Sequence, residues 1–209
     1  MDLLVLAKEP RPGRVKTRLC PPCTPHEAAA IAEAALADTL SAAVACGADR
    51  VVLVLEGAPG PWCPEGVVLV AQGEGDLAAR LAGAWQSTTG PALQIGMDTP
   101  QVSSVDLDDA LAVLDATGTD AVLGPAADGG WWSIGFAGPA PEGVFTGIPT
   151  SRSDTGARQR ARLVDLGLRC VDLPEQVDVD TWREATSVAE AHPRLRFSAA
   201  VRAVRVGAA

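Results

Sequence analysis

The feature that most constrains the fold is the alternation of short apolar runs with helical patterns over the first 125 residues. Five apolar runs have the length and composition of buried strands, at residues 2–7, 50–55, 67–71, 92–96 and 120–124. Helical patterns lie between most of them, at residues 25–46, 76–86 and 105–116. This alternation predicts an α/β protein with a mainly parallel sheet and helices on both of its faces.

The alternation becomes less regular after residue 125. Strand patterns occur at residues 131–136 and 169–173, and helical patterns occur at residues 153–166 and 181–191. A chain of 209 residues can bury one sizeable core, and it needs no second domain. We therefore expect a single domain over residues 1–192 and an arginine-rich tail over residues 193–209. The tail is expected to form a solvated helix or to contact a second copy of the chain, with docking of another partner as the alternative.

Composition excludes several classes of partner. The formal net charge of −9 argues against general binding to nucleic acid or to anionic membranes, since both are bound through broad basic surfaces. The odd count of five cysteines suits reduced thiols, and we expect a soluble, cytoplasmic protein. Cys20 and Cys23 form a C-x-x-C, but a zinc site needs a second ligand pair, so we expect them to be inert rather than metal-binding or redox-active.

A basic loop follows the first apolar run, and its charge contrasts with the acidic chain around it. Five basic residues and one acidic residue lie within residues 6–19, the bases being Lys8, Arg11, Arg14, Lys16 and Arg18. Such a loop, with flexible backbone at Gly13, can surround a polyphosphate through its charges and its main-chain N–H groups. The sequence here is neither a Walker loop nor a dinucleotide-binding fingerprint. The alternative is a solvated loop whose charges pair with nearby acids.

Two carboxylates are candidates for a metal site. Asp98 follows the buried strand at residues 92–96, where a carboxylate that faces a cleft needs a cation or another partner. Asp178 and Asp180 alternate along an extended segment and therefore point the same way. Asp98 and Asp180 together fit Mg²⁺ or Mn²⁺, since Mg²⁺ usually takes one or two protein carboxylates and completes its shell with phosphate oxygens and water. The alternative for Asp180 is the N-cap of the following helix.

A glycine pair in the segment GPAADGGWWSIG follows the fifth apolar run. Gly129 and Gly130 would let the backbone approach a ligand closely, and Asp128 could accept hydrogen bonds from hydroxyl groups. A tight turn between two strands would use the same residues. If the next residues form a strand, Trp131 and Trp132 lie on opposite faces, one in the core and the other lining a cleft.

These loops are expected to share one cleft, because ligands of open parallel sheets bind beyond the carboxyl ends of the strands. Neither histidine, His26 or His192, lies in one of them, so we do not expect histidine-based catalysis. Transfer at a phosphate-activated centre needs mainly positioning, cations and a metal, which is what these loops offer.

Five ordered motifs make the chain resemble the nucleotide-diphospho-sugar transferase superfamily. They lie at residues 7–19 (AK-x-P-x-PG-x-VKTRL), 72–77 (QG-x-G-DL), 95–100 (IG-x-D-x-P), 124–130 (GPA-x-DGG) and 178–181 (D-x-D-T). Within the superfamily the chain is most similar to the glycosyltransferase-like subgroup called radical-SAM/selenodomain-associated transferases, relatives of 2-phospho-lactate guanylyltransferase. The resemblance implies a three-layer, Rossmann-like glycosyltransferase-A type fold.

The resemblance also implies roles for the motif residues. It implies phosphate contacts and catalytic roles for Lys16 and Arg18, metal ligation for Asp98 and Asp180, and a catalytic role for Asp98. The remaining expected nucleotide contacts are Ala7, Lys8, Gly13, Gln72 and Asp76. The expected contacts to acceptor or sugar are Asp128, Gly129, Gly130 and Trp131. The family usually has tyrosine after the DGG, whereas this chain has Trp131.

The sequence therefore predicts a Mg²⁺- or Mn²⁺-dependent transferase whose partners are a nucleotide or nucleotide-sugar and a small acceptor. In this fold a single early aspartate with a late one is the nucleotidyltransferase arrangement, so nucleotidyl transfer from a nucleoside triphosphate to a small phosphorylated or sugar-like acceptor is slightly favoured. The alternatives are a glycosyltransferase that uses a nucleotide-diphospho-sugar donor, and a non-catalytic nucleotide-binding module. We expect no nucleic-acid or membrane partner, and a homodimer is an open alternative.

Overall fold

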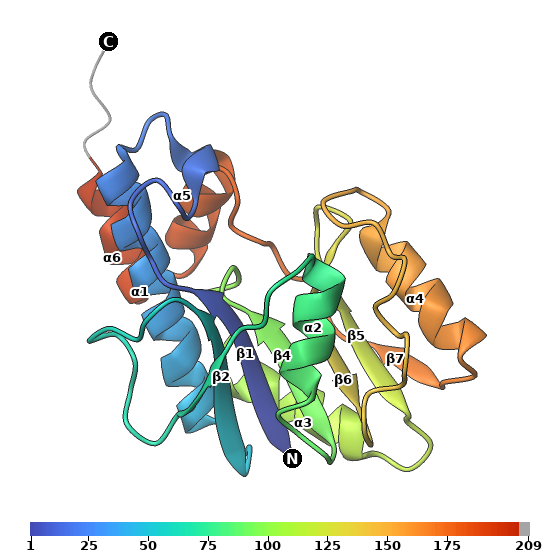
Figure 1. The fold of residues 1–209 in the computed structure, drawn as a ribbon. Helices are drawn as coiled ribbons and strands as arrows, with labels where there is room; N and C mark the ends of the chain where they lie inside the picture. Colours follow the sequence, from blue (N-terminus) through green and yellow to red (C-terminus); the bar gives the residue numbers. More distant parts are fainter. Residues whose placement is uncertain (205–209) are drawn as a thin grey trace.

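One seven-stranded sheet forms the centre of the molecule in the computed structural model, which describes residues 1–204 (Figure 1). The strand order is β3-β2-β1-β4-β6-β5-β7. The strands are β1 (Asp2–Lys8), β2 (Arg50–Glu56), β3 (Val68–Ala71), β4 (Ala92–Gly96), β5 (Ala121–Pro125), β6 (Trp131–Phe136) and β7 (Cys170–Asp172). Neighbouring strands are parallel, except that β6 runs antiparallel to both β4 and β5. The predicted α/β class with a mainly parallel sheet is confirmed.

Helices cover both faces of this sheet. They are the short 3₁₀ helix η1 (Thr17–Leu19), α1 (Pro25–Ala45), α2 (Leu77–Trp85), α3 (Ser104–Asp115), α4 (Thr155–Asp165), α5 (Trp182–Ala191) and α6 (Arg196–Ala203). Buried residues of α1 and α3 pack in one apolar cluster with β1, β2 and β4. Buried residues of α2 and α4 belong to a second cluster on the opposite face. The expected three-layer arrangement is therefore present.

Local sequence signals explain where several helices begin. Capping boxes open α1 at Thr24, α3 at Ser103 and α5 at Thr181, each with an acidic residue three positions later. The side chain of Thr181 accepts the N–H of Glu184, so Thr181 is the N-cap of α5. The alternative role of Asp180 as that N-cap is therefore wrong, and its carboxylate is available for other contacts.

The stretch after His192 contains a helix, as expected, but this helix is not the solvated one that we expected. This helix, α6, packs against α1 and α5 in a third apolar cluster, with Phe197 and Val201 buried. Their spacing of four residues puts both side chains on one helix face. The carboxylate of Asp38 on α1 accepts the N–H of Phe197 at 2.8 Å, which satisfies a free donor at the start of α6. Residues 205–209 of the predicted tail lie outside the described residues.

One helix, α1, is long and apolar enough to cross a membrane by length and composition alone. In this fold 56% of its most apolar stretch is buried inside the protein. It packs against β1, α3 and α6, as a core helix does.

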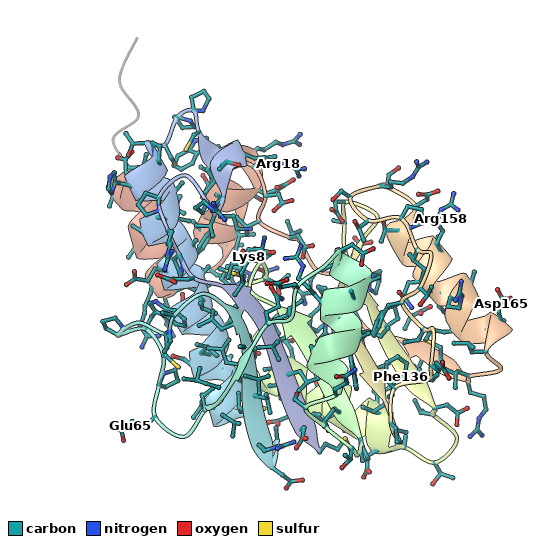
Figure 2. The ribbon with its side chains drawn as sticks, viewed as in Figure 1. Lys8, Arg18, Glu65, Phe136, Arg158 and Asp165 are labelled. Carbon is teal, nitrogen blue, oxygen red and sulfur yellow. The ribbon has the colours of Figure 1, made fainter. Side chains whose placement is uncertain are left out.

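The carboxyl ends of the parallel strands meet at one edge of the sheet. The basic loop leaves β1 at this edge, and Figure 2 shows Lys8 at the end of β1 and Arg18 in η1 near the C-terminal helices. The segment before α5 returns to the same place, since the N–H of Val179 donates to the carbonyl oxygen of Asp98 at 2.8 Å. This hydrogen bond aligns the late D-x-D segment with the loop after β4.

Candidate functional site

Two adjoining pockets lie at the carboxyl edge of the sheet. The first, of about 390 Å³, carries five basic side chains and is called the basic pocket: Lys8, Arg14, Lys16, Arg18 and Arg80. The second, of about 380 Å³, is called the acidic pocket after four carboxylates on its wall: Asp98, Asp128, Asp178 and Asp180. The two share seven lining residues: Leu6, Arg18, Leu77, Gly96, Asp98, Ser151 and Asp180. They therefore form one continuous cleft, as the shared loops predicted.

Most cations of the basic pocket have an acidic partner. Lys8 and Arg80 share the Glu56 carboxylate, at 3.2 Å and 3.1 Å. Arg18 lies 3.0 Å from Asp180. Arg14 is exposed, and no ion pair of its guanidinium is found within residues 1–204. The side chains that line the basic pocket keep a net positive charge. Part of the ion pairing expected for a solvated loop is also present.

Lys16 is the best buried of these cations. Its side chain is only 7% exposed, and Nζ lies 2.5 Å from Asp98 Oδ1 and 3.3 Å from Asp180 Oδ1. It also donates to the carbonyl oxygen of Val179. Burial alone would lower the pKa of the Lys16 ammonium, but the two carboxylates raise it above its usual value, so the amine stays charged. Its backbone has φ of 48°, in the left-handed region, which orients the side chain at a conformational cost.

The carboxylates around Lys16 outnumber it. Burial, together with the nearby charges of Asp98 and Asp128, raises the pKa of Asp178 to about 7. Such crowding of like charges favours a further cation. Asp98 and Asp180 supply hard oxygen ligands from two segments, which suits Mg²⁺ or Mn²⁺ with phosphate and water as the remaining ligands. Among residues 1–204, no group of three or more His, Cys, Asp or Glu lies close enough together to hold a metal ion unaided.

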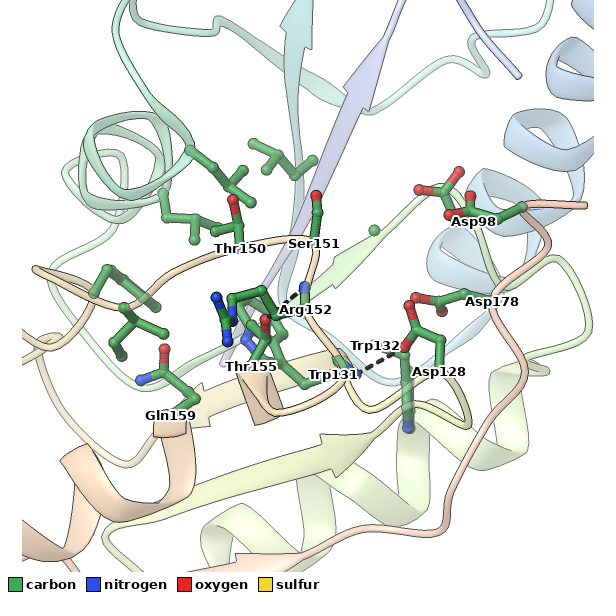
Figure 3. Close-up of a pocket in the computed structure, with 18 of the residues that line it drawn as sticks. Asp98, Asp128, Trp131, Trp132, Thr150, Ser151, Arg152, Thr155, Gln159 and Asp178 are labelled. Atoms are coloured by element: carbon green, nitrogen blue, oxygen red, sulfur yellow. Dashed lines mark hydrogen bonds between the residues drawn. The ribbon is translucent and has the colours of Figure 1, made fainter. Parts of the chain in front are cut away.

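The opposite end of the acidic pocket is apolar with two buried amides. We call it the amide end and define it by Leu81, Gln94, Phe145 and Gln159. Figure 3 shows Gln159 on the side of the pocket away from Asp98 and Asp178. The pocket therefore changes from charged to uncharged polar along its length.

The turn after β5 is built mainly from its own hydrogen bonds. Asp128 Oδ1 accepts the N–H of Gly130 at 2.7 Å. Gly129 has φ of +88°, and a Cβ there would lie 2.0 Å from the carbonyl oxygen of Ser153. The predicted close backbone approach at Gly129 is thus made by the protein's own chain rather than left free for a ligand. Trp132 is buried in the cluster with α1 and α3, and its Nε1–H donates to the carbonyl oxygen of Pro174 at 3.0 Å. Trp131 is half-buried against the opposite cluster and lines the acidic pocket, so the two side chains lie on opposite faces of the sheet, as predicted.

The structure brings most predicted site residues to the two pockets. Lining positions are Ala7, Lys8, Lys16, Arg18, Gln72, Asp98, Asp128, Gly130, Trp131 and Asp180. Three predicted residues do not line either pocket, namely Gly13, Asp76 and Gly129. Asp76 instead caps α2 by accepting the N–H of Ala79 at 2.9 Å. Gly13 has φ of +74°, which fits a role in the path of the loop.

Several lining residues were not predicted from the sequence. Gln94, Gln159 and Arg80 come from secondary-structure elements, and Ser151 and Arg152 come from the segment before α4. The sequence does single out Gln94, since it is a polar residue inside the apolar run ALQIG. Ser151 has a positive φ of 57°, which the sequence does not indicate.

The cysteine pair lies outside this cleft. Cys20 and Cys23 are free thiols, and burial together with the neighbouring Cys20 raises the pKa of Cys23 to about 11. A thiol with such a pKa is mostly protonated at neutral pH and is a weak nucleophile.

Comparison with protein families gives one assignment. The profile of the family described as "Uncharacterized protein conserved in bacteria (DUF2064)" matches residues 30–152. The chain belongs to this family. A comparison with curated proteins gave no match.

Solved structures with the same fold include transferases. A candidate nucleotide-diphospho-sugar transferase from Desulfovibrio desulfuricans G20 has a TM-score of 0.86 and 25% identity, with 96% of this chain and 94% of that chain covered. Rv0371c of Mycobacterium tuberculosis H37Rv in complex with manganese has a TM-score of 0.52 and 21% identity, over 91% and 98% of the two chains. A CMP:2-keto-3-deoxy-manno-octonic acid synthetase bound to CTP has a TM-score of 0.57 and 12% identity, over 93% and 99%. The two more distant likenesses establish the fold.

Proposed function

We propose that this family member is a Mg²⁺- or Mn²⁺-dependent nucleotidyltransferase of the glycosyltransferase-like subgroup indicated by its motifs. The nucleoside triphosphate binds in the basic pocket, and a small phosphorylated or sugar-like acceptor binds in the acidic pocket. The observation that carries the proposal is the convergence of Asp98 and Asp180 on Lys16 Nζ, at 2.5 Å and 3.3 Å, where the two pockets meet. Two carboxylates from distant segments, surrounded by cations, suit a metal–phosphate complex.

The residues of the basic pocket bind and orient the triphosphate. Arg14 and Arg18 have largely exposed guanidinium groups that can form charge-assisted hydrogen bonds with phosphate oxygens. Lys16 lines the same pocket and contacts both Asp98 and Asp180, so its ammonium can contact a phosphate placed beside the metal ligands. Gln72 and the backbone of Ala7 form the inner wall, where the base and ribose would lie.

In the transfer step the acceptor oxygen forms a bond to the α-phosphorus, while the bond from that phosphorus to the bridging oxygen breaks and pyrophosphate leaves. An ionised phosphate oxygen attacks without losing a proton, whereas a hydroxyl acceptor releases its proton to water. Asp98 and Asp180 would hold the divalent cation, which neutralises phosphate charge when bound. The side chains contribute mainly position and charge, since phosphoryl chemistry needs little else from the protein. The acidic pocket meets the basic pocket at the shared residues, so an acceptor there faces the phosphates.

The second candidate is glycosyl transfer from a nucleotide-diphospho-sugar. It is favoured by the likeness to the Desulfovibrio desulfuricans protein at 25% identity over 96% of this chain. In that case the sugar, rather than an acceptor, would occupy the acidic pocket next to the diphosphate. The cytoplasm is the compartment where either nucleotide donor is abundant, and we place the protein there.

A thermal-shift panel separates the two candidates. The protein is screened with MgCl₂ or MnCl₂ and with ATP, CTP, GTP, UTP, UDP-sugars, GDP-sugars and dTDP-sugars, because a ligand of the native state raises the melting temperature. We expect a triphosphate to give the largest metal-dependent shift. Asp98→Asn should remove the metal dependence, whereas the exposed Asp115→Asn should retain it.

Three outcomes decide between the candidate functions. A larger shift with a nucleotide-sugar than with every triphosphate would favour glycosyl transfer. A metal-independent shift, equal in the parent and in Asp98→Asn, would refute the two-carboxylate site. In a separate turnover assay with phosphorylated and sugar-like acceptors, binding that releases neither pyrophosphate from a triphosphate nor a nucleoside diphosphate from a nucleotide-sugar would indicate a non-catalytic nucleotide-binding module.

A further inference from the structure

Gln94 is a polar residue in an apolar setting. It lies in the middle of β4, paired in register with Leu4 of β1 and Ile134 of β6, both fully buried. Its own side chain is only 2% exposed, and Oε1 has no hydrogen-bond partner among residues 1–204. A buried amide without a hydrogen-bond partner destabilises the folded protein, so stability does not explain a glutamine at this position.

Gln159 supplies a second buried amide to the same pocket. It is 1% exposed, and its Nε2 donates to the carbonyl oxygen of Val144 at 3.0 Å. This hydrogen bond holds the amide of Gln159 in place. Its carbonyl oxygen can then accept a hydrogen bond from a ligand. Leu81 and Phe145 provide apolar surface beside the two amides. The amide end thus combines one amide held by a hydrogen bond, one amide oxygen without a partner and an apolar wall.

The amide end has no charged side chain of its own. Within the described part of the chain, the only Lys or Arg residues that line the acidic pocket are Arg18, at the junction, and Arg152. Arg152 is 60% exposed and pairs with Asp154 at 3.2 Å. Figure 3 shows Arg152 and Thr155 between Gln159 and the carboxylates. An anionic group at the amide end would lose its hydration and gain no buried counter-charge, which is costly.

We infer that the amide end binds an uncharged, hydroxyl-bearing group with an apolar face, and that Gln94 is a specificity-determining residue for it. A hydroxyl group both donates and accepts, so it satisfies a glutamine amide in either orientation. The apolar face of the same group would pack on Leu81, Phe145 and the half-buried ring of Trp131. The inference deepens the proposed function and rests on it, since it assigns this group to the body of the acceptor.

Replacement of Gln94 should affect the stability of the free protein, which is measured without any ligand. Gln94→Leu removes an unpartnered buried amide and keeps much of its volume, so the free protein should keep its melting temperature or gain about 2 °C. Gln94→Met is a second variant in case the branched side chain does not fit. Gln86→Leu changes an exposed glutamine outside both pockets and is the control.

Ligand binding is tested with matched neutral and acidic probes. D-glucose, D-galactose, myo-inositol and glycerol are compared with D-glucuronate, D-galacturonate and D-glycerate by saturation-transfer difference NMR. MgCl₂ is present throughout, and each titration is run with and without the triphosphate that gives the largest thermal shift. We expect at least one neutral probe to bind about tenfold more tightly than its acidic counterpart. Gln94→Leu should weaken that binding about tenfold, by the loss of a hydrogen bond, and Gln86→Leu should not change it.

The outcomes separate this inference from the proposed function. If no neutral probe binds, if acidic probes bind more tightly, or if Gln94→Leu binds as the parent does, the inference is wrong. A fall of more than about 4 °C in the melting temperature of both Gln94 variants would assign Gln94 a structural role and overturn it as well. Failure of triphosphate binding, with neutral probes still bound through Gln94, would instead refute only the nucleotide part of the proposal.

Discussion

Lys16 is the counter-charge of the carboxylate cluster, and removing its charge should destabilise the metal-free protein. Lys16→Met keeps the length of the side chain and removes the ammonium that lies 2.5 Å from Asp98 and 3.3 Å from Asp180. Loss of one partner of a fully buried ion pair costs roughly 3–5 kcal/mol, whereas an exposed pair contributes about 1 kcal/mol or less. The lysine side chain is 7% exposed but the two carboxylates are 45% and 40% exposed. Water can rehydrate them, so we expect a loss of about 2 kcal/mol.

The assay is urea unfolding in EDTA and then in MnCl₂. In EDTA, Lys16→Met should lose about 2 kcal/mol of unfolding free energy, and the double variant Lys16→Met with Asp98→Asn should recover part of it because the repulsion is smaller. In MnCl₂ the single variant should gain more stability than the parent, since no ammonium competes for the two carboxylates. The double variant should gain little.

Arg18→Met is the matched control for Lys16→Met. Its guanidinium is 68% exposed and, among residues 1–204, pairs only with Asp180, so its loss should change the unfolding free energy by less than about 1 kcal/mol. Equal stability of Lys16→Met and the parent in EDTA would refute the role of Lys16 as counter-charge. An equal response of the single and double variants to MnCl₂ would refute Asp98 as a metal ligand.

Two further predictions concern the stability of the fold. Gly129→Ala should lose about 3 kcal/mol of unfolding free energy, because the new Cβ would meet the backbone of Ser153 at a positive φ. Gly13→Ala, with φ of +74° but nothing within 4 Å of the new Cβ, should lose only about 1 kcal/mol, and urea unfolding that ranked the two variants in the opposite order would contradict this view. Arg169 lowers the pKa of Asp120 to about 2, so the pair stabilises the fold at pH above about 4 and loses this effect as the pH falls through 2. Arg169→Gln should therefore show a flatter dependence of unfolding free energy on pH between 4 and 2, and an unchanged slope would refute the assignment.

The elements of the first 125 residues were predictable because each has a local signal. The run at residues 92–96 is β4 over the same residues, and the capping box at Thr24 starts α1 where expected. The placement of β6 between β4 and β5, antiparallel to both, was not predictable, because an apolar pattern does not specify a strand's neighbours. The packing of α6 depends on Asp38, 159 residues away in the chain from the N–H that it accepts.

The candidate site was predictable in its residue types and less so in its contacts. The charge of the first loop located Lys16, a strand end located Asp98, and the alternation of Asp178 and Asp180 located Asp180. The structure places Lys16, Asp98 and Asp180 together. That the lysine is buried between the carboxylates follows from a contact across 164 positions of sequence, which no local pattern reports. The amide end was missed because Gln159 occupies an ordinary helix position and Gln94 is a single exception in an apolar run.

The ion pairs of the free protein are the same groups that the proposed substrates would use. In the free protein Lys16 and Arg18 pair with Asp98 and Asp180. When a metal and a triphosphate bind together, the carboxylates can bind the metal and the basic side chains can bind the phosphates. Either ligand alone would leave one set of charges without a partner in a half-buried site, which is costly. Binding of metal and nucleotide should therefore be mutually strengthening, and the coupling is reciprocal by linkage. The free protein meanwhile keeps these clustered carboxylates compatible with folding, because Lys16 already pairs with two of them, Asp98 and Asp180.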